Sequence, residues 1–330
     1  AQDETGCDVL KREIKVGLWA AVAAVAVAVV SLNALAYSHA YSMTHYIAAG
    51  AMTAKPEQLK AAGKLEALVR GVRIVRPVSD EVPSALDPAC QALTIRREDG
   101  ARLSAWFCER GEASPLVIIF HGYAKEKTFL LPEAKAFLEL GASVLLVDFQ
   151  GSGGSSGNTT TIGVREAGDV AAAVRYAKGR LPPHARVILY GQSMGAVAIL
   201  KAVHDGAVAP DAVILEGVFD TLLNTVRNRF ASMKVPSFPS AELLVFWGGV
   251  QLGFNGFSLR PVDYAKSVYC PLLVMHGSED PRVSVGEARR VFEAAPGPRR
   301  FELFEGVAHE SYVARYPEKW RQLVSAIMRR

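Results

Sequence analysis

From residue 89 onward, short apolar runs alternate with stretches in which apolar residues recur every three or four positions. Uninterrupted apolar runs are typical of strands that are buried on both faces of a sheet, and the longer spacing is typical of helices. The runs predict strands at 116–120, 144–149, 187–190, 212–215 and 272–275, with a weaker one at 301–304. The intervening stretches predict helices at 132–140, 166–180, 194–203, 285–294 and 317–328. This order predicts an α/β fold with a doubly wound, mostly parallel sheet.

Two earlier segments, 91–97 and 102–108, predict a hairpin that turns at Asp99-Gly100. A three-residue loop at 98–100 gathers the apolar residues of both strands on one face, whereas a two-residue loop divides them between two faces. Burial therefore favours the longer loop, which pairs Cys90 with Cys108. Directly opposed residues have Cβ atoms about 4.5–5.5 Å apart, close enough for a disulfide after a small adjustment. We predict that disulfide, with two reduced, facing cysteines as the alternative.

Between the strand that ends near Gly217 and the strand that follows Pro271, the chain is much longer than a crossover helix requires. This segment is rich in aromatic residues, which a solvated loop would not be. It predicts a helical lid at about 218–262. Phe230 and Trp247 are our candidates for side chains that bind the apolar part of a substrate.

The N-terminal part of the chain carries no charge from Val16 to Ala54, and its first portion is dense in Ala, Val and Leu. About 20 such residues span a bilayer as a helix. Lys11, Arg12 and Lys15 precede the segment, so the positive-inside rule predicts a cytoplasmic N-terminus and an exported body. A cleaved signal peptide, with an A-x-A site at 34–36, and a soluble helix interrupted by polar residues are the alternatives.

These segments divide the chain into four parts. We expect a cytoplasmic tail at 1–15, a transmembrane anchor at 16–37, a connector with a helix at 56–69 inside 38–88, and a catalytic domain at 89–330. The net charge of the 330 residues is only +4, with acids and bases mixed along the chain, so nucleic acid is not an expected partner. No C-x-x-C pair occurs among the cysteines, so neither a zinc nor a redox motif is expected.

A candidate nucleophile is Ser193, which lies in Gly191-Gln192-Ser193-Met194-Gly195 between a predicted strand and a predicted helix. A G-x-S-x-G sequence alone is common by chance, but a strand–turn–helix context is typical of a nucleophile elbow. The serine of such an elbow has a strained backbone, and small neighbours two residues away avoid a collision.

A serine hydroxyl needs a base, and the base needs an acid that orients it. His309, which follows the last predicted strand, is our candidate base. Asp280 ends the sequence His276-Gly277-Ser278-Glu279-Asp280 and is our candidate acid, with Glu279 as its rival. The order Ser, Asp, His along the chain is the order that an α/β-hydrolase requires.

An oxyanion hole requires two donors. The backbone N–H of Met194 directly follows the nucleophile, and that of Tyr123 lies in the turn His121-Gly122-Tyr123 after a predicted strand. We expect His121 to brace this turn without contacting substrate. The glycine-rich sequence after Asp148 lacks the lysine of a phosphate-binding loop, so we interpret it as a structural turn.

From about Cys90 to its end, the chain resembles the α/β-hydrolase superfamily, and it looks most like bacterial serine hydrolases near the BEM46-like and ABHD17-like branch. The motifs around His121, Asp148, Ser193, Asp280 and His309 carry this resemblance, and Gln150, where many relatives have Arg, departs from it. The resemblance implies an intact Ser-His-Asp triad, with no cofactor and no metal. It does not specify the substrate, because this fold serves many acyl-transfer reactions.

We therefore predict a single-pass membrane protein whose catalytic domain is extracytoplasmic and cleaves small-molecule or lipid acyl esters. An aminopeptidase or an acyl-protein thioesterase on the same triad is the first alternative. An aminopeptidase would need a lid carboxylate for the free amine, and the lid offers few acids against several bases. A non-catalytic subunit of a membrane complex is an alternative of a different class.

Overall fold

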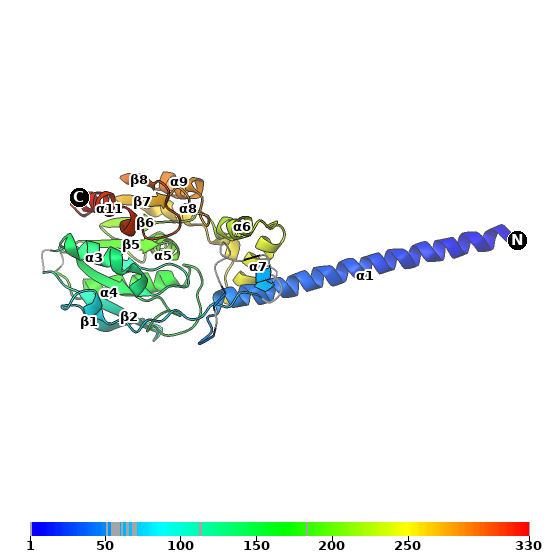
Figure 1. Ribbon diagram of the computed structural model, residues 1–330, viewed down its shortest axis with the longest axis horizontal. Coiled ribbons are helices and arrows are strands. Elements are labelled where there is room, and N and C mark those ends of the chain that lie inside the picture. Colours follow the sequence, from blue (N-terminus) through cyan, green and yellow to red (C-terminus); the bar gives the residue numbers. More distant parts are fainter. Residues whose placement is uncertain are drawn as a thin grey trace.

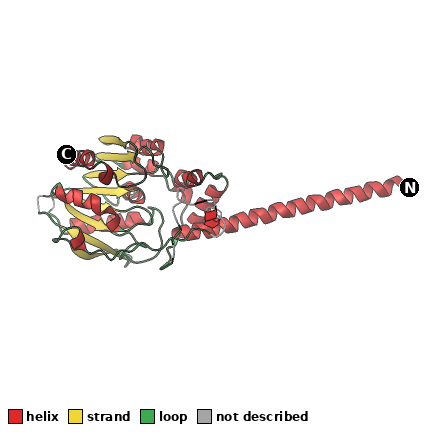
Figure 2. Ribbon diagram, in the orientation of Figure 1, coloured by secondary structure: helices red, strands yellow, loops and turns green. Residues whose placement is uncertain are grey.

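A central sheet carries the fold (Figure 1 and Figure 2). The computed structural model describes residues 2–50, 52–53, 60, 62–63, 66–67, 71–111, 114–182 and 184–329. Within these ranges, eight strands lie in the order β1-β2-β4-β3-β5-β6-β7-β8. Strand β2 pairs antiparallel with both β1 and β4, and the other neighbouring strands pair parallel. The predicted doubly wound, mostly parallel sheet is confirmed.

The predicted strands are all present, with ends that differ by one or two residues. Their bounds are β1 Gln91–Arg96, β2 Arg102–Cys108, β3 Leu116–Phe120, β4 Ser143–Val147, β5 Val187–Gln192, β6 Ala212–Glu216, β7 Leu272–Gly277 and β8 Arg299–Phe304. The helices are α1 Gln2–Thr44, α3 Leu131–Glu139, α4 Glu166–Lys178, α5 Met194–His204, α6 Leu222–Met233, α7 Ser240–Leu252, α8 Pro261–Tyr264, α9 Val285–Ala294, α10 Tyr312–Arg315 and α11 Pro317–Met328.

Side chains of the parallel strands point alternately into two cores, one on each face of the sheet. On β3, Leu116, Ile118 and Phe120 belong to the core under α4, α5 and α9. Val117 and Ile119 belong to the core under α3 and α11. Because both faces are covered, the inner parallel strands are mostly apolar, which explains why they are visible as apolar runs, whereas the edge strand β8 carries charged residues.

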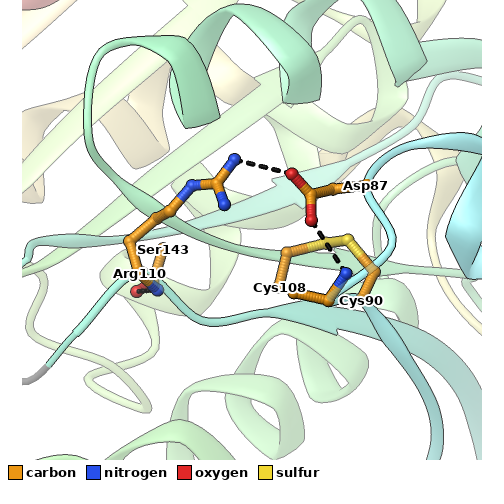
Figure 3. The surroundings of a disulfide bond; sticks show 6 residues. Asp87, Cys90, Cys108, Arg110 and Ser143 are labelled. Carbon is orange, nitrogen blue, oxygen red and sulfur yellow. Dashed lines mark hydrogen bonds and ion pairs between the residues drawn. A yellow bond between two sulfur atoms is a disulfide. The ribbon is translucent and has the colours of Figure 1, made fainter.

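The β1–β2 hairpin has the register that burial predicts. Leu93 faces Ala105 and Ile95 faces Leu103, and Gly100 has a φ of +84° in the loop. At the open end of the hairpin, Cys90 and Cys108 form a disulfide in the structure (Figure 3). An ion pair of 2.8 Å between Asp87 and Arg110 lies beside it. The hairpin is thus held at both ends.

Helix α1 is a single helix of 43 residues, about 65 Å at 1.5 Å per residue, and it projects far beyond the sheet (Figure 1). It is long and apolar enough to cross a membrane. The helix continues to Thr44, beyond the expected end of the anchor. Asn33 does not interrupt it, because its side-chain amide donates to the Val29 carbonyl at 2.9 Å. The helix expected at 56–69 lies for the most part outside the described residues.

The insertion between β6 and β7 forms the expected helical lid, which contains α6, α7 and α8. Helix α7 packs along the C-terminal part of α1 (Figure 1). The Trp247 indole donates to Asn33 Oδ1 at 3.1 Å, and its ring contacts the Tyr37 ring edge-on at 5.5 Å. The inserted helices thereby join the N-terminal helix to the domain that contains the sheet.

Candidate active site

Ser193 lies at the tip of a tight turn between β5 and α5. Its φ of +52° is in the left-handed region, which a non-glycine residue adopts only under constraint. A Cβ added to Gly191 would lie 2.6 Å from the Ala196 nitrogen, and one added to Gly195 would lie 2.3 Å from the Phe120 carbonyl oxygen. Only glycine fits at these two positions, as the sequence predicts. The turn presents the serine side chain above the carboxyl end of the sheet.

His309 and Asp280 approach the same place from the loops after β8 and β7. The Nδ1–H of His309 donates to Asp280 Oδ2 at 2.6 Å. Asp280 also accepts backbone N–H groups from Arg282 at 2.8 Å and Val283 at 3.1 Å through its other oxygen. Burial would raise the pKa of the Asp280 carboxyl, but the hydrogen bond and charge of His309 outweigh it, and the pKa is lowered. Asp280 therefore stays ionised at neutral pH.

A pocket brings Ser193 and His309 together. It is lined by Gly122, Tyr123, Lys125, Phe129, Gln192, Ser193, Arg229, Arg282 and His309. A Cβ at Gly122 would lie 3.5 Å from the Ser193 Cβ, so the turn after β3 lies directly against the nucleophile turn. Asp280 contacts His309 from the side of the ring that bears Nδ1, which leaves Nε2 for the pocket.

Of the two candidate oxyanion donors, Tyr123 lines this pocket and Met194 directly follows the pocket residue Ser193. Met194 is the first residue of α5, where the N–H groups of a helix have no acceptor within the helix. Tyr123 lines the pocket, and its hydroxyl donates a hydrogen bond to the Met43 carbonyl at the end of α1. The backbone of Ala124 in turn donates to the Tyr46 hydroxyl at 3.3 Å. The N-terminal helix and the residues after it thus hold the candidate oxyanion loop.

Residues behind the site brace its loops. His121 is buried, accepts the Phe149 N–H at 3.1 Å through Nε2, and donates from Nδ1 to the Gly122 carbonyl at 2.8 Å. Burial lowers its pKa, so the ring is neutral, and it braces the turn as predicted. Asp148 binds the Lys127 ammonium at 2.6 Å and the Gly154 N–H at 3.0 Å, which supports the interpretation of this segment as a structural turn.

The other residues considered for the acid and the base have different surroundings. Glu279 is exposed, whereas Asp280 contacts His309. His276 is buried and bonds through Nε2 to the Val283 carbonyl at 2.9 Å, so it shapes the turn that carries Asp280. Among the described residues, no group of three or more His, Cys, Asp or Glu side chains is arranged to hold a metal ion.

The two predicted substrate contacts of the lid pack against α1. Phe230 and Trp247 do not line the serine pocket. Phe230 is buried with Ala40, Ala241 and Leu244, and Trp247 packs against the same cluster. Helix α1 supplies an apolar partner for these aromatic residues, and no local sequence pattern reveals that partner.

A second pocket, with a volume of about 50 Å³, lies between the lid and the end of α1. Apolar side chains dominate its lining, with Met43 from α1, Leu222 and Val226 from α6, Leu244 from α7 and Ile162 from the loop before α4. Helix α6 connects the two pockets, because Val226 lines this one and Arg229, one turn later, lines the serine pocket.

A buried acidic network near His309 was not anticipated from the sequence. Glu133 accepts the Ser311 hydroxyl at 2.6 Å, and Glu216 accepts the Trp320 indole N–H at 2.6 Å. Burial raises the pKa of Glu133 to about 7, and burial together with the charge of Glu133 raises the pKa of Glu216 to about 8. The residues of this network come from β6, α3, α11 and the His309 loop, so only the folded chain brings them together.

Comparison with known proteins identifies the family. The family described as serine aminopeptidase, S33, matches residues 111–233. An uncharacterized protein of Mycobacterium tuberculosis, Rv2307c, is 30% identical over 240 residues, which cover 71% of this chain and 78% of that one. The rat lysophosphatidylserine lipase ABHD12 is 25% identical over 207 residues, which cover 58% of this chain and 48% of the lipase.

Among solved structures, the Pyrococcus furiosus esterase Pf2001 has a TM-score of 0.65 and 25% sequence identity, over 78% of this chain and 98% of the esterase. The chain belongs to the α/β-hydrolase family of serine hydrolases. Its similarity to an esterase and a lipase marks it as an esterase- or lipase-like hydrolase. The finer resemblance to the BEM46-like and ABHD17-like branch stays a prediction.

Proposed function

We propose that the protein hydrolyses carboxylic acyl esters, with Ser193 as nucleophile, His309 as base and Asp280 as the acid that orients His309. The observation that carries this proposal is the 2.6 Å contact between Asp280 and His309 at a pocket that also contains Ser193 on a strained turn. Strain of this kind at a solvent-accessible serine is typical of a functional site.

The reaction follows from this geometry. His309 Nε2 accepts the Ser193 proton while the serine oxygen attacks the acyl carbonyl, and the carbonyl π electrons move to its oxygen. The N–H groups of Met194 and Tyr123 stabilise that oxyanion. His309, whose charge Asp280 stabilises, returns the proton to the departing alcohol as the ester bond breaks. Water then attacks the acyl-enzyme by the same route, which releases the acid and restores Ser193.

An aminopeptidase, which the name of the matching family suggests, has less support. Its substrate presents a free ammonium group, which requires a carboxylate near the serine. Asp220 binds Arg290 at 2.7 Å, and Glu242 binds Arg227 at 2.6 Å. Neither carboxylate lines the serine pocket, whereas several basic side chains do. This charge pattern favours an ester over a peptide with a free amine.

We further propose that the apolar pocket between α6, α7 and α1 receives the acyl chain. This pocket takes the acyl-binding role that the sequence analysis gave to Phe230 and Trp247. Burial of each methylene contributes about 0.8 kcal/mol, so an apolar pocket that shares α6 with the serine pocket favours substrates with an acyl tail. The similarity to the rat lysophosphatidylserine lipase agrees with an acyl ester of lipid type.

Helix α1 is the proposed membrane anchor of the enzyme, at 16–37, with the tail 1–15 in the cytoplasm and the catalytic domain 89–330 outside. Residues 12–31 of the helix are exposed along their whole length, and they are largely apolar. On the adjacent lid helix α7, Phe246 and Val250 remain 47% and 54% exposed. A bilayer around α1 would cover these apolar surfaces. Protease added to intact cells should reach the body; digestion only after lysis would contradict this orientation.

The test of the proposed reaction is the replacement Ser193→Ala. Hydrolysis of 4-nitrophenyl butyrate should fall by at least about a thousandfold, while the circular dichroism spectrum and thermal midpoint stay unchanged. The exposed Ser79→Ala serves as a matched control with full activity. A Ser193→Ala activity within about tenfold of the unmodified enzyme would overturn the assignment. Such a result would indicate either a different nucleophile or a protein that does not use this site for catalysis.

A further inference from the structure

Helix α7, which packs along α1 (Figure 1), is apolar on every side. Its residues 243–250 are all leucine, valine, phenylalanine, tryptophan or glycine. The inner side, which includes Leu244 and Gly248, lines the apolar pocket. The outer side exposes Phe246 and Val250. Because helices that are apolar all round are covered on all sides in folded proteins, the outer side of α7 requires an apolar partner.

Aromatic rings connect this outer side to α1. The Phe246 ring lies 5.0 Å from the Trp247 ring, which in turn contacts the Tyr37 ring of α1 at 5.5 Å. The Trp247 indole and the Asn33 side chain are hydrogen-bonded to each other, as apolar surroundings require of polar groups. We call Phe246, Trp247 and Val250 the α7 face. This face is continuous with the exposed apolar surface of α1.

The aromatic residues of α1 indicate where the proposed membrane span begins and ends. Trp19 and Tyr37 are both exposed, and at 1.5 Å per residue the helix places them about 27 Å apart along its axis. This separation is close to the thickness of the hydrocarbon core of a bilayer, about 30 Å, and tryptophan and tyrosine favour its two boundaries. Basic residues at 11–15 precede the first boundary. The second boundary of the proposed span falls at Tyr37, the residue that contacts Trp247.

The apolar pocket lies directly beyond this second boundary. Ala40 and Met43 of α1 line the pocket, and they follow Tyr37 by about 5 Å and about 9 Å along the helix axis. The α7 face and the pocket are on opposite sides of α7, so about 10 Å, the diameter of one helix, separates them. The pocket is therefore within reach of an acyl chain that lies in the adjacent layer of the bilayer.

We propose that the α7 face inserts into the outer surface of the bilayer that α1 spans, and that a membrane-resident acyl ester enters the apolar pocket from this surface. The insertion rests on the geometry of α1 and α7, whereas the entry route also rests on the proposed esterase function. A bilayer is the partner because the α7 face continues an apolar, exposed helix that is long enough to cross one. Inserted apolar surfaces of this kind lie about 5–10 Å inside the headgroup boundary.

Fluorescence quenching measures the insertion in the full chain, reconstituted in phosphatidylcholine vesicles. A Phe246→Cys variant, combined with Cys7→Ser and Cys270→Ser, carries an environment-sensitive fluorophore. Part of the lipid carries a nitroxide near the head of its acyl chain. The matched control is Tyr269→Cys in the same background, because Tyr269 is an exposed aromatic residue that precedes β7 at the amino edge of the sheet. The nitroxide should quench the label on the α7 face and leave the control label unchanged.

Two results would overturn the insertion. The first is equal quenching of both labels, or quenching of neither. The second is a label on the α7 face that loses contact with water as the ratio of protein to lipid rises, while the nitroxide lipid does not quench it. That second result would show that another copy of this chain covers the α7 face.

Hydrolysis tests the entry route with two esters that share one leaving group: 4-nitrophenyl palmitate embedded in the vesicles and 4-nitrophenyl butyrate in solution. The combined Phe246→Ser and Val250→Ser replacements should lower palmitate hydrolysis by about tenfold, because exposed apolar area is lost from the membrane contact, and should leave butyrate hydrolysis unchanged. Tyr269→Ser is the control and should change neither rate. Equal effects on the two esters, or no effect on palmitate, would overturn the entry route.

Failure of the proposed function has a different signature. Neither ester would then be hydrolysed in a Ser193-dependent manner, which would refute the entry route together with the esterase. The quenching measurement does not depend on catalysis, so it would still decide whether the α7 face inserts into the bilayer.

Discussion

The hydroxyl of Tyr123 donates a hydrogen bond to the backbone carbonyl of Met43, which is 80 residues earlier in the chain. Met43 lies in the last turn of α1, and Tyr123 carries one of the two proposed oxyanion donors. The nearby Tyr46 is buried, and its ring lies 6.4 Å from the Tyr123 ring. The proposed anchor helix therefore supports the candidate oxyanion loop directly, in addition to its proposed role at the membrane.

A Tyr123→Phe variant tests this support, because it keeps the aromatic ring and the backbone N–H and removes only the hydroxyl. Loss of one hydrogen bond that positions the loop should lower kcat by about two- to tenfold, with little change in KM. Tyr316→Phe, which removes a hydroxyl bonded to the Glu305 carbonyl on the surface, is the control. Identical kcat values for the two variants and the unmodified enzyme would show that the contact has no catalytic effect.

The apolar pocket predicts a dependence on acyl chain length. A Val226→Phe replacement on α6 fills part of the pocket. Hydrolysis of decanoyl esters should then fall about tenfold more than hydrolysis of acetyl esters, because only the longer chain needs the space.

Trp247→Ala provides the contrast to this variant. It removes the contacts with Asn33 and Tyr37, so it should lower the thermal midpoint without a preference for chain length. If Trp247→Ala reduces decanoyl hydrolysis selectively and Val226→Phe does not, the acyl chain binds along the aromatic face of the lid instead.

The Glu133 and Glu216 pair predicts how stability changes with pH. Both folded-state pKa values are raised, from 4.5 to about 7 and about 8, so the folded protein keeps protons that the unfolded chain has already released. The free energy of unfolding contributed by this pair is fully present below about pH 4.5 and is lost as the pH rises to about 8.

Glu216→Gln removes one of these protons while its amide oxygen can still accept the Trp320 indole N–H. Urea unfolding measured between about pH 5 and 8 should show a smaller loss of stability with pH in this variant. The exposed Glu98→Gln is the control. The same pH dependence in all three proteins would contradict the raised pKa of Glu216.

The Cys90–Cys108 disulfide predicts that these two cysteines are oxidised when the protein resides in an oxidising compartment. Mass spectrometry of an unreduced digest of protein from the cell envelope should find the two residues linked, whereas Cys270, which is not in this disulfide, should react with alkylating reagents after unfolding. A bond across 18 residues adds up to about 3 kcal/mol to the free energy of unfolding, which reduction should remove. Free thiols at both positions would contradict the bond and the proposed export.

The sequence was most informative where a short segment decides its own structure. The strands were predictable because burial on both faces makes them apolar runs. The Ser193 turn was predictable because of the glycines on either side of it. The hairpin register was predictable because a one-residue slip would have split its apolar set, as the pairing of Ile95 with Leu103 illustrates. The contact between Asp280 and His309 followed from two loops at the same edge of a parallel sheet.

What the sequence did not reveal depends on contacts between distant segments. The packing of Trp247 was hidden because its partners, Asn33 and Tyr37, are more than 200 residues away. Glu216 ended an apolar strand and gave no sign that Trp320 would bind it. The composition of the serine pocket was equally hidden, since Arg229 and Arg282, which both line it, belong to elements far apart in the chain that Thr225 and Asn228 join.

The most direct test of the account is to treat the full chain with a fluorophosphonate and to identify the modified residue by peptide mass spectrometry. An activated serine attacks phosphorus and expels fluoride, so the account predicts a single adduct on Ser193. Labelling should fall by at least about a hundredfold in His309→Ala, because the hydroxyl then lacks its base. An unmodified Ser193 in folded protein, or an adduct that forms equally well without His309, would contradict the proposed triad.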